Sequence, residues 1–221
     1  MSLSSLLSEI HSCTACAHEL PLRPRPIVQV HGDARILIVS QAPGRKAHES
    51  GRPFSDASGE RLRSWMGISQ DDFYDPRSTA IVPMGFCFPG SGANGDLGPR
   101  PECAPLWRDR LLGELTRVQL TVIVGSYALA WHWPDATRSV TSAVSAWREH
   151  WPALVPLPHP SPRNNRWLSD NPWFEHDVVP ALRTRVATVL GAPRDGTPAE
   201  GAPRLHGSAP ATSTRAAPGA G

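Results

Sequence analysis

The chain contains four cysteines, and their spacing is the first sign of chemistry in it. Cys13 and Cys16 form a C-x2-C pair, whereas Cys87 and Cys103 are separated by the Gly- and Pro-rich residues 88–102. In a cytosolic protein, whose thiols stay reduced, such a set indicates a metal site before it indicates disulfides. Zinc and iron–sulfur clusters both use four thiolates, and the wide second pair favours the larger cluster. Four unrelated buried cysteines are the alternative.

Two short loops carry further groups that suit a ligand site. In residues 41–44 (QAPG), Gly44 permits close backbone approach, so that free amides can face an anion or an oxyanion. In residues 159–165 (HPSPRNN), His159 is followed by two prolines that stiffen the loop. Asn164 and Asn165 offer hydrogen bonds to a base edge or a phosphate. Each loop also fits an ordinary tight turn, but the two together favour a site.

The elements that must position these loops alternate along the chain. Short β-rich runs predict strands over residues 36–40, 79–82, 120–125 and 154–157, and helical periodicity predicts helices over 59–66, 103–117, 141–151 and 173–190. This alternation predicts right-handed crossovers and a three-layer α/β/α sandwich around a four-stranded parallel sheet. Ligands of such sheets bind outside the carboxyl ends of the strands, where both loops are expected.

Composition predicts one globular domain and a tail. Hydrophobic residues make up 40% of the 221-residue chain, enough for a core over residues 1–190. Residues 191–221 contain one Leu and no aromatic residue, so we expect a disordered C-terminal tail. No apolar run reaches the ~20 residues of a membrane span, and the first residues lack the basic segment of a secretory signal. These features predict a cytoplasmic protein without a membrane partner.

The motifs taken together resemble the iron–sulfur branches, families 4 and 5, of the uracil-DNA glycosylase superfamily. That pattern has an N-terminal C-x2-C, a P-G motif after the first strand, a G-R-P-F segment, two further cysteines and an H-P-[SA] motif. The chain presents the same order: Cys13 and Cys16, residues 41–44 (QAPG), residues 51–54 (GRPF), Cys87, Cys103, and residues 159–161 (HPS). The resemblance covers residues 3–187.

The resemblance implies a role for each motif. Cys13, Cys16, Cys87 and Cys103 would hold a structural 4Fe–4S cluster, and the partner would be DNA with one nucleotide flipped out of the stack. Phe54 would stack on the extruded base, while His159 and the amides near Gln41 and Ala42 would stabilise the departing base. The residues expected to shape the pocket or contact the DNA are Pro43, Gly44, Ser161, Arg163, Asn164 and Asn165.

Two positions depart from the family pattern. Many members carry a catalytic Asp before the motif proline, but this chain has Ala42, as family 5 does. We therefore expect Asp56 to be the general base, with Glu49 and His48 as alternatives, although Asp56 also fits a helix N-cap. Family 4 reads uracil with an Asn where this chain has Pro83, which has no side-chain donor or acceptor.

The prediction is a monomeric DNA glycosylase that removes uracil, or a related deaminated or modified base, in base excision repair. Two alternatives belong to other classes. One is an inactive iron–sulfur DNA-binding protein of the same fold, which Ala42 and Pro83 favour. The other is an electron-transfer protein, which would need an exposed cluster and no pocket containing Phe54 and His159.

Overall fold

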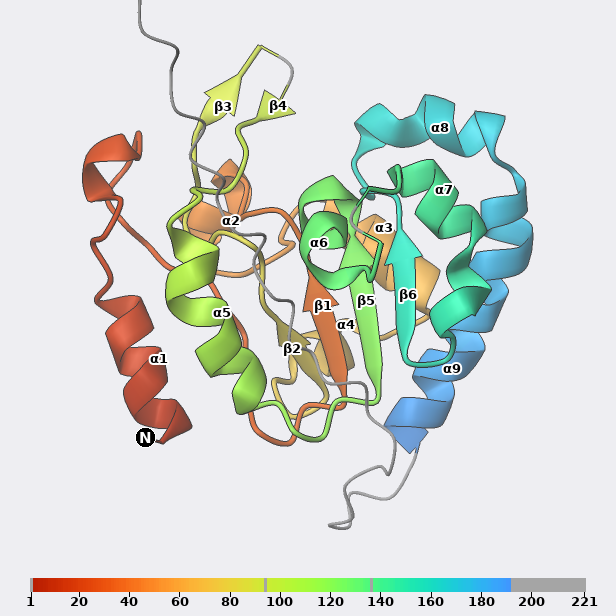
Figure 1. Ribbon diagram of the computed structural model, residues 1–221, viewed down its shortest axis with the longest axis horizontal. Coiled ribbons are helices and arrows are strands. Elements are labelled where there is room, and N and C mark those ends of the chain that lie inside the picture. The colour runs from red at the N-terminus through yellow and green to blue at the C-terminus, as the bar shows by residue number, and fades with distance from the viewer. Residues whose placement is uncertain (1, 94, 136, 192–221) are drawn as a thin grey trace, which may run out of the picture.

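The central sheet contains four parallel strands. The computed structural model describes residues 2–93, 95–135 and 137–191 (Figure 1), so the predicted tail lies outside the described residues except for Gly191. The strands are β1 (Ile36–Val39), β2 (Thr79–Ile81), β5 (Leu120–Val124) and β6 (Leu154–Leu157), in the order β2-β1-β5-β6. All are buried along their length, as expected for a parallel sheet covered on both faces.

Helices cover both faces of this sheet. Ile36 and Ile38 pack into one apolar cluster, and the alternate residues Leu37 and Val39 pack into another. The first cluster includes residues of α3 (Ala57–Met66), α4 (Gln70–Tyr74) and α9 (Val179–Gly191); the second includes residues of α1 (Leu3–His11), α5 (Cys103–Gly113) and α6 (Gly125–His132). The predicted three-layer α/β/α sandwich and its four-stranded parallel sheet are confirmed.

Shorter elements complete the chain. They are the helices α2 (Arg45–Ser50), α7 (Val140–Ser145) and α8 (Asn165–Asp170), the 3-10 turns η1 (Ala17–Glu19), η2 (Trp147–His150) and η3 (Pro162–Asn164), the π-helical turn η4 (Phe174–Val178), and the hairpin strands β3 (Ser91–Gly92) and β4 (Gly95–Asp96). The β3–β4 hairpin and α8 stand at the same end of the molecule (Figure 1).

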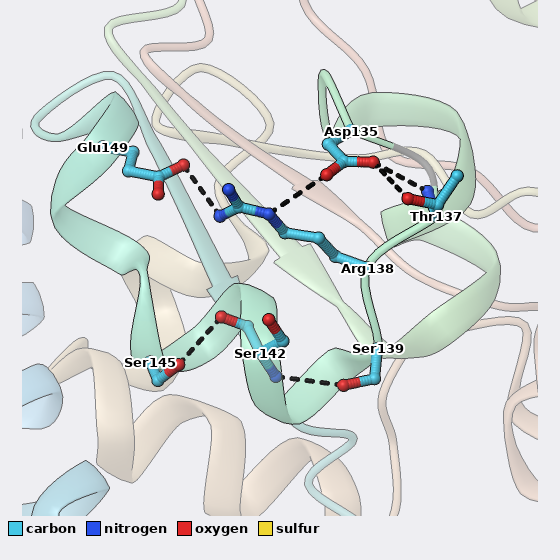
Figure 2. Close-up of polar contacts among 7 residues, drawn as sticks. All are labelled: Asp135, Thr137, Arg138, Ser139, Ser142, Ser145 and Glu149. Carbon is cyan, nitrogen blue, oxygen red and sulfur yellow. Dashed lines mark hydrogen bonds and ion pairs between the residues drawn. The ribbon is translucent and has the colours of Figure 1, made fainter.

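The predicted elements differ from the observed ones mainly at their ends. The predicted strand over residues 120–125 stops at Val124, because Gly125 adopts φ +81° and begins α6. The predicted helix over 141–151 is divided into α7 and η2. Ser139 caps α7 by accepting the Ser142 amide, and Arg138 joins Asp135 to Glu149, which fixes the two ends of this region (Figure 2).

At both edges of the sheet, some of the backbone hydrogen-bonding groups are already paired or are missing. At the β2 edge, Gln29 exchanges two backbone hydrogen bonds with Ile81, and its side chain donates to the carbonyls of Phe73 and Thr79. At the other edge, β6 contains Pro156, which has no backbone N–H.

A buried arginine fixes the loop that follows β2. Arg108 of α5 is 0% exposed and donates to the carbonyls of Val82 (3.0 Å) and Pro83 (2.8 Å). It also contacts Nε2 of His132, the last residue of α6. Since α5 begins at Cys103, one helix contains both a predicted cluster ligand and the anchor of this loop.

Candidate functional site

A pocket of about 620 Å³ lies at the carboxyl ends of the parallel strands. Its walls come from the loops after β1, β2 and β6, from the start of α3, and from the β3–β4 hairpin. Most of the predicted site residues line it: Gln41, Ala42, Pro43, Gly44, Phe54, Asp56, His159, Ser161, Arg163 and Asn164. The fold thus brings together two loops that are more than one hundred residues apart in the sequence.

His159 is held in a defined state. The backbone amide of Ser161 donates to its Nδ1 (3.2 Å), and the Asn164 side chain donates to its carbonyl (2.7 Å). Because Nδ1 accepts a hydrogen bond, the proton of the neutral ring lies on Nε2. Burial lowers the pKa of His159, and the nearby carboxylates of Asp56 and Asp96 only partly oppose this effect. A neutral imidazole with a donor at Nε2 therefore forms part of the pocket wall.

Two carboxylates contribute to the same pocket. Asp56 is the N-cap of α3, where its Oδ1 accepts the Gly59 amide at 3.1 Å. Asp96 extends from the β3–β4 hairpin, and its Oδ1 accepts the Ser91 hydroxyl at 2.8 Å. Each has a second carboxylate oxygen, so the observed hydrogen bond of each is compatible with activating a water molecule. Asp96 was not among the predicted site residues, since nothing in its Gly-rich segment predicts its position.

The part of the pocket beside β2 is apolar. It contains Ile81 and Pro83, neither of which has a side-chain donor or acceptor. Two buried serines also line the pocket, Ser40 at 5% exposure and Ser58 at 7%. A hydroxyl rotates to donate or accept, so these serines suit more than one pattern of base substituents. No sequence motif indicated either serine as a site residue.

Three of the residues considered for the site do not line the pocket. Glu49 and His48 belong to α2; the carbonyls of both accept hydrogen bonds from Arg25, and His48 packs near Phe88 with ring centroids 6.2 Å apart. The helix directs Arg45, Lys46 and Ala47 to the pocket in their place. Asn165 begins α8, beyond the part of its loop that reaches the pocket.

The four cysteines line a second, smaller cavity of about 20 Å³, here called the cysteine hollow. Cys13 and Cys16 follow α1, Cys87 lies in the loop after β2, and Cys103 begins α5. No disulfide joins these cysteines. Within the described residues, no group of three or more His, Cys, Asp or Glu side chains is arranged to hold a metal ion. A four-iron cluster spreads its thiolates over four irons, so it does not require them to meet at one ion.

The surroundings of the cysteine hollow suit a cofactor with several sulfurs. Burial raises the pKa of Cys87 to about 11 and that of Cys103 to about 12, so both are neutral thiols unless a cation binds them. Other parts of the wall are apolar, from Pro24, Pro26 and Phe86. The wall also includes Trp107, whose buried Nε1 has no hydrogen-bond partner among the described residues. The donor set and this unpaired N–H are compatible with an iron–sulfur cluster.

Residues 28–183 match the family model described as "Uracil DNA glycosylase superfamily". The match spans the central sheet and every residue of the pocket, and it includes Cys87 and Cys103 but not Cys13 and Cys16. In a separate finding, none of the helices in the described part of the chain has the length and apolarity needed to cross a bilayer.

Proposed function

The chain belongs to the uracil DNA glycosylase superfamily, and on this basis we propose that it hydrolyses the N-glycosidic bond of uracil, or of a related deaminated or modified base, in DNA. Superfamily membership itself indicates a DNA glycosylase in general terms. The observation that best supports the finer proposal is the neutral His159, fixed by the Ser161 amide in a pocket that also contains two carboxylates and Phe54.

Access to the bond requires that the nucleotide leave the stack. A glycosylase extrudes its target nucleotide at a cost of a few kcal/mol, and the cost is smallest at a mismatched or damaged pair. Phe54 offers a ring on which the extruded base stacks, a contact worth about 1–3 kcal/mol per base. Ser161, Arg163 and Asn164 lie on the rim formed by the loop after β6, where they can contact the DNA backbone.

The chemical step follows from the groups in the pocket. The bond between C1′ and the base nitrogen breaks with its electron pair moving to the base, so negative charge grows on a base oxygen. The Nε2–H of His159 and the backbone amides near Gln41 and Ala42 stabilise this charge. The oxygen of a water molecule then bonds to C1′, and its proton passes to a carboxylate, for which we propose Asp56.

Base selection is expected to be broader than uracil alone. Pro83 and Ile81 offer no hydrogen bond to the base edge, whereas Ser40 and Ser58 donate or accept as the base requires. Because position 83 has no side-chain amide to match one pattern of base substituents, this side of the pocket imposes little penalty on another base. We therefore propose that deaminated purines or modified cytosines are substrates beside uracil.

The proposal includes a 4Fe–4S cluster on Cys13, Cys16, Cys87 and Cys103. When bound, the cluster supplies a structural cross-link between the segment after α1 and the start of α5. Burial keeps the thiols of Cys87 and Cys103 protonated, and binding of the cluster would release these protons and hold both residues as thiolates. Visible absorption of the freshly purified protein distinguishes this cluster from colourless zinc. We further propose that the protein acts as a monomer in the cytoplasm.

A substrate panel tests the proposal. Single- and double-stranded oligonucleotides carrying uracil, hypoxanthine, xanthine or a modified cytosine are incubated with the wild type and with His159→Ala, and alkaline cleavage at the resulting abasic site is measured. We expect cleavage of at least one substrate by the wild type, and a rate lower by about 10²–10³-fold for His159→Ala. Binding without cleavage of any substrate would favour the alternative, an inactive DNA-binding protein. Neither binding nor cleavage would overturn both.

A further inference from the structure

We infer that Tyr74 is a positioning residue for Phe54, because its hydroxyl holds the backbone that directs the Phe54 ring into the pocket. This inference rests on the proposed function, in which Phe54 stacks on the extruded base. Tyr74 is the last residue of α4 and does not line the pocket itself.

The backbone of Phe54 is in an unusual conformation. Its φ is +52°, and it is the only non-glycine residue with positive φ in the described part of the chain. The left-handed region is unfavourable for a residue with a large side chain, so the surrounding structure must stabilise it. Such strain is common where a side chain has to be presented to a ligand.

The stabilising contacts converge on the Phe54 carbonyl. The Tyr74 hydroxyl lies 3.0 Å from this oxygen and 3.1 Å from the carbonyl oxygen of Pro53, so it can donate to either. Arg63 of α3 donates more weakly to the Phe54 carbonyl, at 3.4 Å. The hydroxyl therefore lies within hydrogen-bond distance of two consecutive peptide groups of the loop and donates to one or the other.

Tyr74 is itself fixed on both sides. The guanidinium of Arg52 lies over its ring at 3.9 Å, and the Phe73 ring meets it edge-on at 5.1 Å. Phe73 also contacts the Phe54 ring, at 6.2 Å between centroids. Arg52, Tyr74, Phe73 and Phe54 thus form a continuous chain of ring contacts. Tyr74 therefore has little freedom to move away from the Phe54 backbone.

Gly59 completes the arrangement. A Cβ atom added at Gly59 would lie 1.8 Å from the Phe54 carbonyl oxygen, which is far inside the contact distance of the two atoms. Only glycine therefore allows α3 to approach the loop this closely. The first turn of α3 and the Tyr74 hydroxyl therefore both lie against the carbonyl of Phe54, a residue that lines the pocket.

Loss of the hydroxyl should affect binding only through Phe54. The test uses Tyr74→Phe, Phe54→Leu and the double variant, with Tyr127→Phe as a matched control at the only other tyrosine. The probe is a fluorescent oligonucleotide containing 2′-fluoro-2′-deoxyuridine, whose glycosidic bond resists cleavage, and Kd is measured by anisotropy. We expect Tyr74→Phe to weaken binding about five- to tenfold, as the loss of one hydrogen bond would. In the Phe54→Leu background the effect should be below about twofold, as for Tyr127→Phe.

Amide hydrogen exchange supplies a readout that needs no DNA. We expect Tyr74→Phe to raise the exchange rates of residues 55–59 about fivefold, and Tyr127→Phe to leave them unchanged. Unchanged exchange, or equal loss of affinity with and without Phe54, would overturn the inference. If the wild type fails to bind the oligonucleotide, uracil is excluded as a target base of the proposed function, while the exchange rates still decide whether Tyr74 holds the loop.

Discussion

The pocket and the cysteine hollow are built on different supports. The pocket walls follow directly from β1, β2 and β6, so the parallel sheet determines where Gln41, Pro83 and His159 lie. The cysteines come from the segment after α1, from a long loop, and from the start of α5, none of which is part of the sheet. The two sites also differ in their chemical groups, since the pocket contains an imidazole and two carboxylates, whereas the cysteine hollow contains thiols beside the Arg100–Glu102 ion pair.

This difference predicts separate consequences for the two sites. A change in the pocket should alter catalysis while the sheet and its core persist. A change in the cysteine hollow should first alter stability, because the proposed cluster would join segments that are far apart in the chain. Arg108 is the exception, since it connects α5 to the carbonyl of Pro83 in the pocket.

The largest expected effect is on stability, at the cysteine hollow. Cys103→Ser should remove visible absorption and lower the free energy of unfolding by several kcal/mol, because the proposed cluster binds only the folded arrangement of the four thiols. Denaturant unfolding with tryptophan fluorescence measures this change. A variant that keeps both its colour and its stability would contradict the cluster proposal.

The second prediction concerns catalysis without loss of fold. Asp56→Asn should lower the cleavage rate by about 10²–10⁴-fold, the usual contribution of a general base. Asn is as good an N-cap as Asp, so α3 should keep its stability. Asp96→Asn is the matched variant, with an expected loss below about tenfold. The reverse pattern would assign the general base to Asp96.

Arg108 tests the link between the two sites. Arg108→Met should lower the free energy of unfolding by about 3 kcal/mol, because two buried carbonyls lose their donor. Arg110→Met on the same helix removes an exposed ion pair with Glu9 and should cost about 1 kcal/mol or less. If both variants lowered the free energy of unfolding equally in chemical denaturation, the buried contacts of Arg108 would stabilise the fold no more than the exposed ion pair of Arg110 does.

The smallest expected effect is a pH dependence from His159. Burial lowers its folded-state pKa, whereas Asp56 and Asp96, the charged groups acting on it, raise it to a lesser extent. As pH falls below about 6.5, the unfolded chain binds a proton that the folded protein does not, so stability decreases. His159→Gln should remove this part of the decrease in thermal unfolding between pH 7 and 5, values chosen as roughly bracketing the ordinary His pKa. If the thermal stability of His159→Gln depended on pH in the same way as that of the wild type, the lowered pKa of His159 would be contradicted.

The same contrast explains what the sequence could predict. β-branched runs such as residues 36–39 identify parallel strands, and the loops after them must lie at one edge, so His159 and Gln41 could be placed. Asp96 could not, because strands of only two residues, each containing a glycine, leave no periodic signal. Glu49 was predicted near the pocket but does not line it, since α2 directs Arg45 and Lys46 there instead. Tyr74 acts through a contact twenty residues away in sequence, which no local pattern predicts.

The backbone groups at the two edge strands determine whether copies of this protein can associate by strand addition. An open edge strand offers unpaired amides and carbonyls on which another chain can add a strand. Here the Ile81 amide and carbonyl of β2 are already paired with Gln29, and Pro156 interrupts the amides of β6. Strand addition between copies of the protein is thereby discouraged at both edges of the central sheet.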